Sequence, residues 1–241
     1  DLNFLAFPAY DKEFAKPEVR RAISMAIDRD ALAKSQLAGA QAPARSFVAP
    51  VVVGYRENSC GQACQFDPAK AKQLYADAGG PARLRITYNA DGGHREWVEA
   101  TCAQLTTNLG VPCSGVAEPT YAAVTERLRN KQPVGMFRMR SMMSYPSMAD
   151  YLTSLYSTPG ASNYFGYRNP RFDQLLREGD AARKPADAIG KYQQAENLLA
   201  QDMPVIPLRF SQADFAYSRR VSKVDTDLFG RVDLTTVELA G

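Results

Sequence analysis

The stretch Met136 to Leu152 decides the fold, and it reads Met-Phe-Arg-Met-Arg-Ser-Met-Met-Ser-Tyr-Pro-Ser-Met-Ala-Asp-Tyr-Leu. Its pattern predicts a strand over 134–139, a polar loop over 141–146 and a helix that begins at Ser147. Arg138 and Arg140 are two positions apart, so both project from the same face of a strand. A strand end that carries two guanidinium groups beside a polar loop predicts a surface that binds a polar ligand.

The segment before this stretch alternates between strand and helix patterns. Apolar residues alternate with polar ones over 83–89, which predicts a strand, and helical spacing follows over 94–109. A strand over 113–117 and a helix that contains Tyr121, Val124 and Leu128 lead into the arginine strand. This order is typical of an α/β sheet with crossover helices. Ligands of such sheets gather outside the carboxyl ends of the strands, where 140–145 is expected to lie.

The remaining elements surround this unit. Asp67 and Pro68 are expected to open a helix that Gly79 closes, and Gly39 is expected to end a short helix over 31–37. Three further helices are expected, one that begins at 17 or 18 and two over 170–182 and 185–201. The other expected strands are 2–7, 205–209, 213–217, 221–224 and 232–239. We therefore expect one α/β domain over 1–241.

Length and charge restrict the class of protein. The chain has 241 residues, 45% of them hydrophobic, and a formal net charge of +3. That length is enough for one substantial core. No basic run interleaves with aromatic residues, so no nucleic-acid partner is expected. No apolar run approaches the ~18 residues of a membrane span.

Four cysteines form two pairs that are close in sequence, Cys60 with Cys64 and Cys102 with Cys113. With His94 as the single histidine, their spacing matches no common zinc site, and no metal is expected. Three disulfide connectivities are possible, and local pairing is our interpretation because 60–64 is a tight loop. Four free thiols in a cytoplasmic protein remain the alternative. Disulfides would place the protein outside the cytoplasm.

The arginine stretch also resembles the signature of the peptide/nickel type of ABC-transporter solute-binding proteins, solute-binding family 5. Ser-Asn at 162–163 and Tyr-Arg-Asn-Pro-Arg-Phe-Asp at 167–173 follow it in the family order. Pro-Glu-Val-Arg-Arg-Ala-Ile-Ser-Met-Ala-Ile-Asp-Arg at 17–29 and the segment 192–208 resemble two further family markers. The resemblance covers nearly the whole chain.

The resemblance implies a periplasmic-binding-protein-like type II lobe with a mixed central sheet and flanking helices. It implies the C-terminal lobe of a longer, two-lobed protein whose N-terminal lobe is missing here. Such a protein is extracytoplasmic, either periplasmic or anchored as a lipoprotein, and delivers its solute to an ABC permease. Hinge closure would bury a peptide or peptide-like ligand between the lobes, with an oligosaccharide or an opine as alternatives. No cofactor is implied.

Residue by residue, the resemblance places Arg138 where some peptide-binding members carry an arginine that reads a carboxylate. The family tryptophan falls on Ser141. The family aspartate, which takes the ligand's N-terminal ammonium in peptide-binding members, falls on Ser144, which is therefore expected to face the cleft and contact the ligand. A neutral hydroxyl cannot make the charge-assisted bond of a carboxylate.

Five further expectations concern the side chains around this signature. Arg140 is expected either to bind an anionic group of the ligand or to form a salt bridge within the domain. Met142 would line an adaptable apolar pocket or pack in the core, whereas Met139 is expected in the core. Tyr145 is expected to face the cleft. Asn163 would contact the ligand or stabilise its own turn.

Two other classes of function compete with solute binding. A secreted hydrolase would need His94 as its base if it used a serine–histidine–aspartate triad, and the chain has no Gly-x-Ser-x-Gly motif. A hydrolase could also use a pair of catalytic carboxylates, but no motif in the sequence specifically marks such a pair. A sensory domain that signals ligand occupancy without transport is the third class. We therefore expect a binding protein rather than an enzyme.

Overall fold

The structure, a computed structural model, describes residues 1–36, 41–211, 216–227 and 229–240. Its centre is a six-stranded mixed sheet in the order β2-β6-β1-β5-β3-β4. The strands are β1 (Leu2–Ala6), β2 (Gln41–Pro43), β3 (Leu84–Asn89), β4 (Cys113–Glu118), β5 (Met136–Ser141) and β6 (Val205–Ser211).

The strand directions place several strand ends at one edge of this sheet. β3 runs parallel to both β4 and β5, as the strand and helix alternation predicts. β1 runs antiparallel to β5 and to β6, and β2 runs antiparallel to β6. As a result β5 and β6 end, and β1 and β2 begin, at the same edge. Several polar side chains lie on the strands at this edge, and they form the candidate site below.

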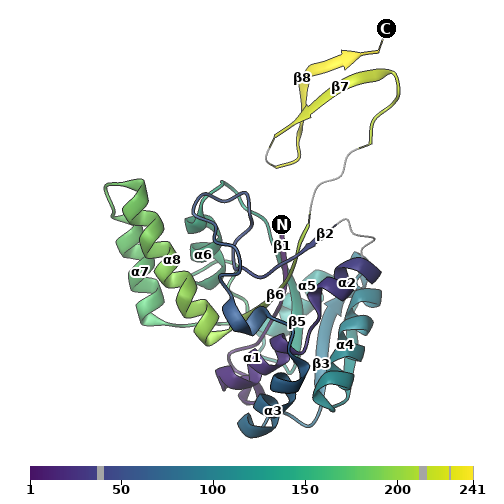
Figure 1. The fold of residues 1–241 in the computed structure, drawn as a ribbon, viewed down its shortest axis with the longest axis vertical. Coiled ribbons are helices and arrows are strands. Elements are labelled where there is room, and N and C mark those ends of the chain that lie inside the picture. Colours follow the sequence, from purple (N-terminus) through teal and green to yellow (C-terminus); the bar gives the residue numbers. More distant parts are fainter. Residues whose placement is uncertain (37–40, 212–215, 228, 241) are drawn as a thin grey trace.

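Eight α-helices are described around the sheet. In Figure 1 the helices α6, α7 and α8 lie on the left of the molecule, α2 and α4 lie on the right, and α1 and α3 lie at the bottom. Their bounds are α1 (Pro17–Met25), α2 (Arg29–Gln36), α3 (Pro68–Ala78), α4 (Arg95–Leu109), α5 (Tyr121–Arg129), α6 (Met148–Tyr156), α7 (Pro170–Asp180) and α8 (Pro185–Asp202). No helix in the described part of the chain combines the length and hydropathy that a membrane crossing requires.

Side-chain caps set the starts of several of these helices. Asp67 accepts a hydrogen bond from the backbone N of Lys70 before α3, and Ser147 accepts one from Ala149 before α6. Gly79 ends α3 with a positive φ of 70°, a conformation that glycine adopts without strain. These three boundaries agree with the sequence prediction. The predicted stop at Gly39 lies outside the described residues.

The long irregular segment after β2 is fastened to the body of the molecule. Cys60 and Cys64 form a disulfide within it, and Cys102 and Cys113 form a second one that ties α4 to β4. The buried carboxylate of Glu196 on α8 holds the segment from the other side. It forms an ion pair of 2.8 Å with Arg56 and accepts a 2.6 Å hydrogen bond from the Ser59 hydroxyl.

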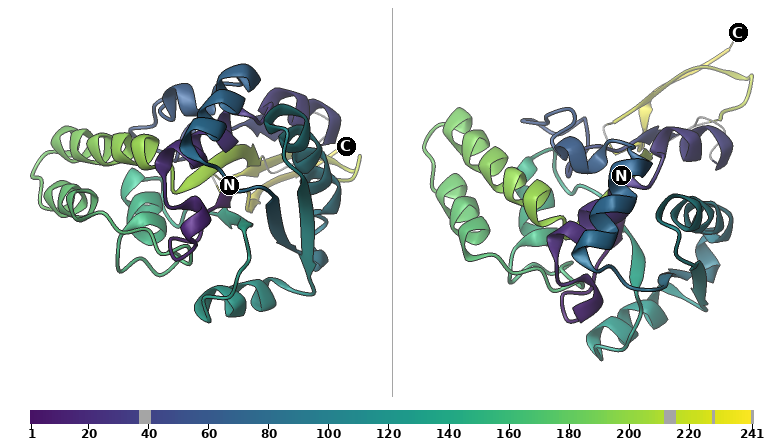
Figure 2. Two further views of the ribbon diagram at one scale, coloured as in Figure 1. Left: turned by 90° about the horizontal axis from the view of Figure 1, so that it is seen from below. Right: turned by 60° about the horizontal axis from the view of Figure 1, so that its bottom comes forward.

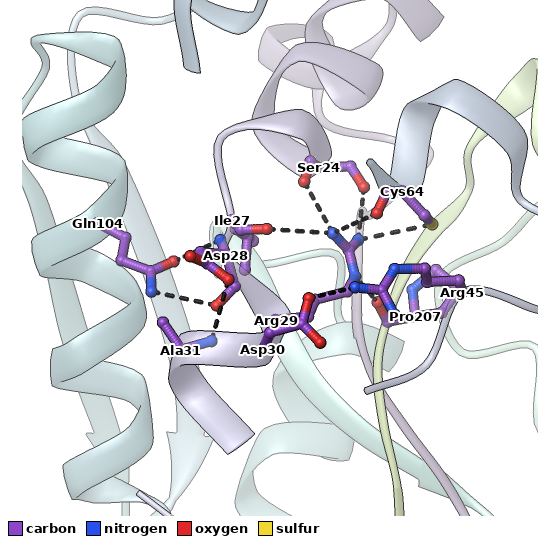
Figure 3. A network of polar contacts seen from close by, with 10 residues as sticks. All are labelled: Ser24, Ile27, Asp28, Arg29, Asp30, Ala31, Arg45, Cys64, Gln104 and Pro207. Atoms are coloured by element: carbon purple, nitrogen blue, oxygen red, sulfur yellow. Dashed lines mark hydrogen bonds and ion pairs between the residues drawn. The ribbon is translucent and has the colours of Figure 1, made fainter. Parts of the chain in front are cut away.

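A buried arginine joins three parts of the fold. Figure 3 shows the Arg29 guanidinium at the start of α2, surrounded by acceptors. Its Nε donates to the carbonyl of Pro207 on β6 at 2.7 Å, and its Nη2 donates to the Ser24 hydroxyl at 2.7 Å. Its Nη1 lies 3.4 Å from the carbonyl oxygen of Cys64. Burial lowers the pKa of Arg29 to about 9, so the group stays charged at neutral pH.

A two-stranded hairpin of β7 (Val221–Thr226) and β8 (Val232–Leu239) extends away from the rest of the molecule (Figures 1 and 2). It presents exposed apolar side chains, including Leu234 and Leu239. The strand predicted over 213–217 is wrong at 216–217, which lie outside any strand. Its first three residues lie outside the described residues.

Candidate functional site

Polar side chains from three neighbouring strands meet at the edge where β5 and β6 end. Asn3 on β1 is paired with Arg140 on β5 on one side and with Arg209 on β6 on the other. Directly paired residues point to the same face of a sheet, so these three side chains share one face. Arg138 lies two positions before Arg140 and shares that face as well. The predicted common face of Arg138 and Arg140 therefore also carries Arg209.

A cavity of about 260 Å³ lies over this face. The helix start after β3 closes its other side. Its lining residues are Asn3, Gln41, Gly92, Gly93, His94, Glu96, Trp97, Arg138, Arg140, Arg209 and Ser211. The cavity is thus lined mainly by polar groups, three of them guanidinium groups.

In the part of the chain that the structure describes, Arg138 has one polar partner. Its Nη1 donates to the side-chain oxygen of Asn89 at 3.1 Å. Its Nε is buried and has no hydrogen-bond partner among the described residues. Burial, and then the positive charge of Arg140, lower the pKa of Arg138. Arg138 therefore faces the cavity with donor capacity that the described protein leaves unused.

Arg140 is more exposed to solvent than Arg138. Its side chain is 51% exposed, and its Nη1 lies 3.6 Å from the Asp1 carboxylate. An ion pair of this kind contributes little to stability because both groups are partly solvated. Both interpretations of Arg140, a salt bridge and a ligand contact, are compatible with this geometry.

Arg209 and His94 both pack against Trp97. The guanidinium carbon of Arg209 lies 4.6 Å from the centre of the Trp97 ring, a cation–π arrangement. The Trp97 indole N–H donates to His94 Nδ1 at 3.2 Å. Burial, and then the charges of Arg138 and Arg209, lower the pKa of His94 to about 4, so His94 is neutral at pH 7.

A second cavity, of about 440 Å³, adjoins the first and shares Ser211 with it. Its lining is mostly apolar and includes Met142, Met143, Tyr151 and Phe210. Met142 is 57% exposed, so it is not a core residue, in agreement with the pocket interpretation. Met139 is buried, as expected. The edge therefore offers a cationic cavity beside an apolar one.

The other predicted site residues lie apart from the two cavities. Ser144 and Tyr145 are exposed, and neither lines them. Asn163 donates to the carbonyl oxygens of Ser157 and Tyr167 at 2.9 and 2.8 Å, and it also accepts from the Tyr167 backbone N. This geometry favours the turn-stabilising interpretation of Asn163. Ligand contact by these three residues stays a prediction.

Two features of this site were missed from the sequence. Arg209 lies two residues before the end of the mostly apolar strand β6, and Asn3 is the polar residue of β1. A lone polar residue near the end of a buried strand is the signal that would have found them. No group of three or more histidine, cysteine or acidic side chains in the described ranges is arranged to hold a metal ion.

The chain is similar to known solute-binding proteins. The model of the bacterial extracellular solute-binding proteins, family 5 Middle, matches residues 1–163. The oligopeptide-binding protein OppA of Bacillus subtilis (strain 168) is 24% identical over 209 residues, which are 81% of this chain and 38% of OppA. The glutathione-binding protein GsiB of Escherichia coli (strain K12) is 25% identical over 230 residues, which are 91% of this chain and 44% of GsiB.

Solved structures show the same fold. HbpA2 from Haemophilus parasuis has a TM-score of 0.83 at 22% identity, covering 99% of this chain and 48% of HbpA2. The dipeptide-binding protein from Pseudoalteromonas sp. SM9913, in complex with Met-Leu, has a TM-score of 0.82 at 20% identity, with the same coverage. The fold is of the type II periplasmic-binding-protein class, as predicted.

This chain spans less than half the length of these relatives. The matched model covers residues 1–163 of 241. The chain therefore belongs to the bacterial extracellular solute-binding proteins, family 5.

Proposed function

We propose that this chain is the C-terminal lobe of an extracytoplasmic solute-binding protein that binds a peptide or peptide-like solute and delivers it to an ABC permease. The observation that carries this proposal is the cavity at the strand ends, which Arg138 lines with a guanidinium group whose Nε has no hydrogen-bond partner among the described residues. A planar guanidinium suits a carboxylate, the group that every peptide carries at its C-terminus. The peptide-binding relatives support the choice of solute.

The adjacent apolar cavity supports the same class of solute. Met142 and Met143 are adaptable side chains that accept apolar groups of different shapes. Because the two cavities meet at Ser211, a solute with an anionic end can place its neighbouring apolar side chain in the second cavity. A neutral oligosaccharide has no anionic group to pair with the arginines of the first cavity.

The position of the edge supports binding between two lobes. β1 enters and β6 leaves the sheet at this edge as neighbouring antiparallel strands, with Leu2 paired to Phe210 (Figure 1). Two adjacent chain connections between lobes suit a hinge. Closure of a second lobe over the open edge would bury the solute. The solute-bound, closed form would then dock on the permease. Anchoring as a lipoprotein or release into the periplasm would both serve this role.

No observation favours the hydrolase. In the described part of the chain His94 accepts from Trp97 and bonds to no serine, threonine or cysteine side chain. A general base needs such a nucleophile within reach. We therefore propose a binding protein rather than an enzyme.

Native mass spectrometry of the full-length protein, purified gently from its own host, tests this function. We expect a co-purified peptide or peptide-like solute, released when Arg138 is replaced by methionine. A neutral saccharide bound equally well by wild type and Arg138→Met would contradict the peptide assignment.

A further inference from the structure

The cationic cavity holds more positive charge than the described protein neutralises. Arg140 has one carboxylate within ion-pair distance, that of Asp1 at 3.6 Å. The Asp91 carboxylate is engaged by the side-chain amide of Asn89, and Glu96 is exposed at the rim. Among the described residues Arg209 forms no ion pair. The cavity thus has a surplus of cations that one carboxylate of a ligand would only partly balance.

Arg209 is the most deeply placed of these cations. It is 8% exposed, yet it lines the cavity, and its Nε has no hydrogen-bond partner in the described part of the chain. Its ring contact with Trp97 orients the guanidinium plane but satisfies none of its N–H donors. Burying an unpaired charge costs free energy unless a partner arrives. A ligand anion is the partner that this position fits.

His94 adds a neutral donor beside these charges. Its Nδ1 accepts from Trp97, so the neutral ring carries its proton on Nε2. A Cβ at Gly92 would lie 2.3 Å from this Nε2, so only glycine leaves room beside it. The surrounding arginines lower the pKa of His94 and so help to keep the ring neutral. His94 can then donate a hydrogen bond to a ligand without adding a further positive charge.

The volume of the cavity limits the size of the group that enters. About 260 Å³ corresponds to roughly nine waters at the ~30 Å³ that each occupies in the liquid. A single acidic residue at a peptide C-terminus is a compact group of this order. It carries two carboxylates, one from the main chain and one from the side chain.

We infer that Arg209 is a specificity-determining residue that binds a second anionic group, so that the preferred solute is a peptide with an acidic C-terminal residue. One carboxylate lies at Arg138 and Arg140, and the other at Arg209. This inference rests on the proposed function and names its substrate class.

The test uses the full-length protein and matched alanine peptides of two, three and four residues that end in glutamate or in glutamine. Isothermal titration measures both series for the wild type, for Arg209→Met and for Arg209→Lys. Methionine keeps an apolar contact with Trp97, and lysine keeps the charge without the planar fork. Arg171→Met is the matched control, because Arg171 is an exposed arginine on α7 outside both cavities.

We expect the wild type and Arg171→Met to prefer the glutamate series by about tenfold or more, the range of a charge-assisted hydrogen bond. The preference falls to about threefold or less in Arg209→Met and is partly kept in Arg209→Lys. Binding of both series with equal affinity, or a preference that survives Arg209→Met, overturns the inference and leaves peptide binding intact. Binding of neither series overturns the peptide function as well.

Thermal unfolding of the ligand-free protein tests whether Arg209 has a structural role instead of a binding role. If Arg209 awaits a ligand anion, Arg209→Met removes an unpaired buried charge, and the ligand-free protein unfolds at the same or a higher temperature. If a carboxylate elsewhere in the full-length protein already pairs with Arg209, the variant unfolds at a lower temperature. That second result overturns the inference.

Discussion

Two buried arginines of this molecule have opposite surroundings. Arg29 donates to the carbonyl oxygens of Pro207 and Ser24 and to the Ser24 hydroxyl (Figure 3). Arg209 is two residues from Pro207 on the same strand, yet its Nε is buried without a partner in the described ranges. Both groups lose hydration on folding, but among the described residues only Arg29 regains hydrogen bonds within the protein.

This difference separates a structural cation from a binding cation. The contacts of Arg29 join the end of α1 and strand β6 to the loop of the first disulfide, so its charge is used by the fold. Arg209 lines a cavity together with two further arginines, so its charge is available to something that enters. Burial alone does not identify a functional arginine. A buried arginine is a candidate for function when the protein supplies few hydrogen-bond acceptors to its guanidinium group.

The largest expected effect is the loss of stability in Arg29→Met. Removing this donor takes its hydrogen bonds from the Pro207 carbonyl oxygen and the Ser24 hydroxyl, at about 1–3 kcal/mol each, whereas the Ser24 carbonyl oxygen keeps the backbone N of Ile27 as a donor. We expect the free energy of unfolding, measured by urea denaturation, to fall by about 3 kcal/mol or more. Arg209→Met is the matched control and is expected to lose none. Equal losses of unfolding free energy in both variants would contradict the distinction between a structural and a binding arginine.

Removal of the first disulfide is expected to have the next largest effect. The bridge between Cys60 and Cys64 closes a short loop, so replacing both by alanine should cost about 2 kcal/mol. Because Arg29 contacts the carbonyl oxygen of Cys64, this loss should be non-additive with Arg29→Met. It should be additive with Arg209→Met. Urea denaturation of the double variants measures both couplings, and the reverse pattern would refute the account.

Restoring the family carboxylate is expected to change affinity rather than stability. Ser144 is exposed, and Ser144→Asp would offer an ammonium group a charge-assisted bond. We expect affinity for a tripeptide with a free amine to rise about tenfold, and affinity for its N-acetylated form to stay unchanged. Isothermal titration with Ser144→Asn as the neutral control measures this. A similar gain with Ser144→Asn would rule out the charge explanation.

The last expected effect is a pH dependence of stability that arises from His94. The folded protein lowers the pKa of this group to about 4, below the unfolded value of about 6.5, so the unfolded state binds more protons between these values. Stability is therefore complete above about pH 6.5 and is lost as the pH falls toward 4. The charges that face the ring are Arg138 and Arg209 with Arg140, opposed by Asp91.

Thermal unfolding between pH 4 and pH 7 measures this dependence. His94→Asn keeps an acceptor for the Trp97 indole and should flatten the profile over this range. Arg209→Met should reduce the loss of stability between pH 6.5 and 4, because removing one repelling charge raises the folded-state pKa of His94 toward its unfolded value. Arg29→Met should leave its shape unchanged. An identical profile in His94→Asn would remove His94 as its cause.

The sequence predicted most elements because their signals are local. The capping residues Asp67 and Ser147 and the terminating Gly79 were each placed correctly. The face shared by Arg138 and Arg140 also follows from strand geometry alone.

The pairing of distant strands could not be predicted in this way. β1 lies between β5 and β6, which are far from it in the sequence. That order brings Asn3 between Arg140 and Arg209, and no local pattern encodes it. The family resemblance directed attention to the loop after β5, whereas the more deeply buried cation lies at the end of β6.

A crystal structure of the full-length protein with the solute it carries from its own host tests the central claim most directly. We predict an anionic group of the solute within hydrogen-bond distance of the Arg138 guanidinium and a second one within reach of Arg209. A solute whose charged groups lie away from both arginines, or a protein carboxylate paired with Arg209, would contradict the account.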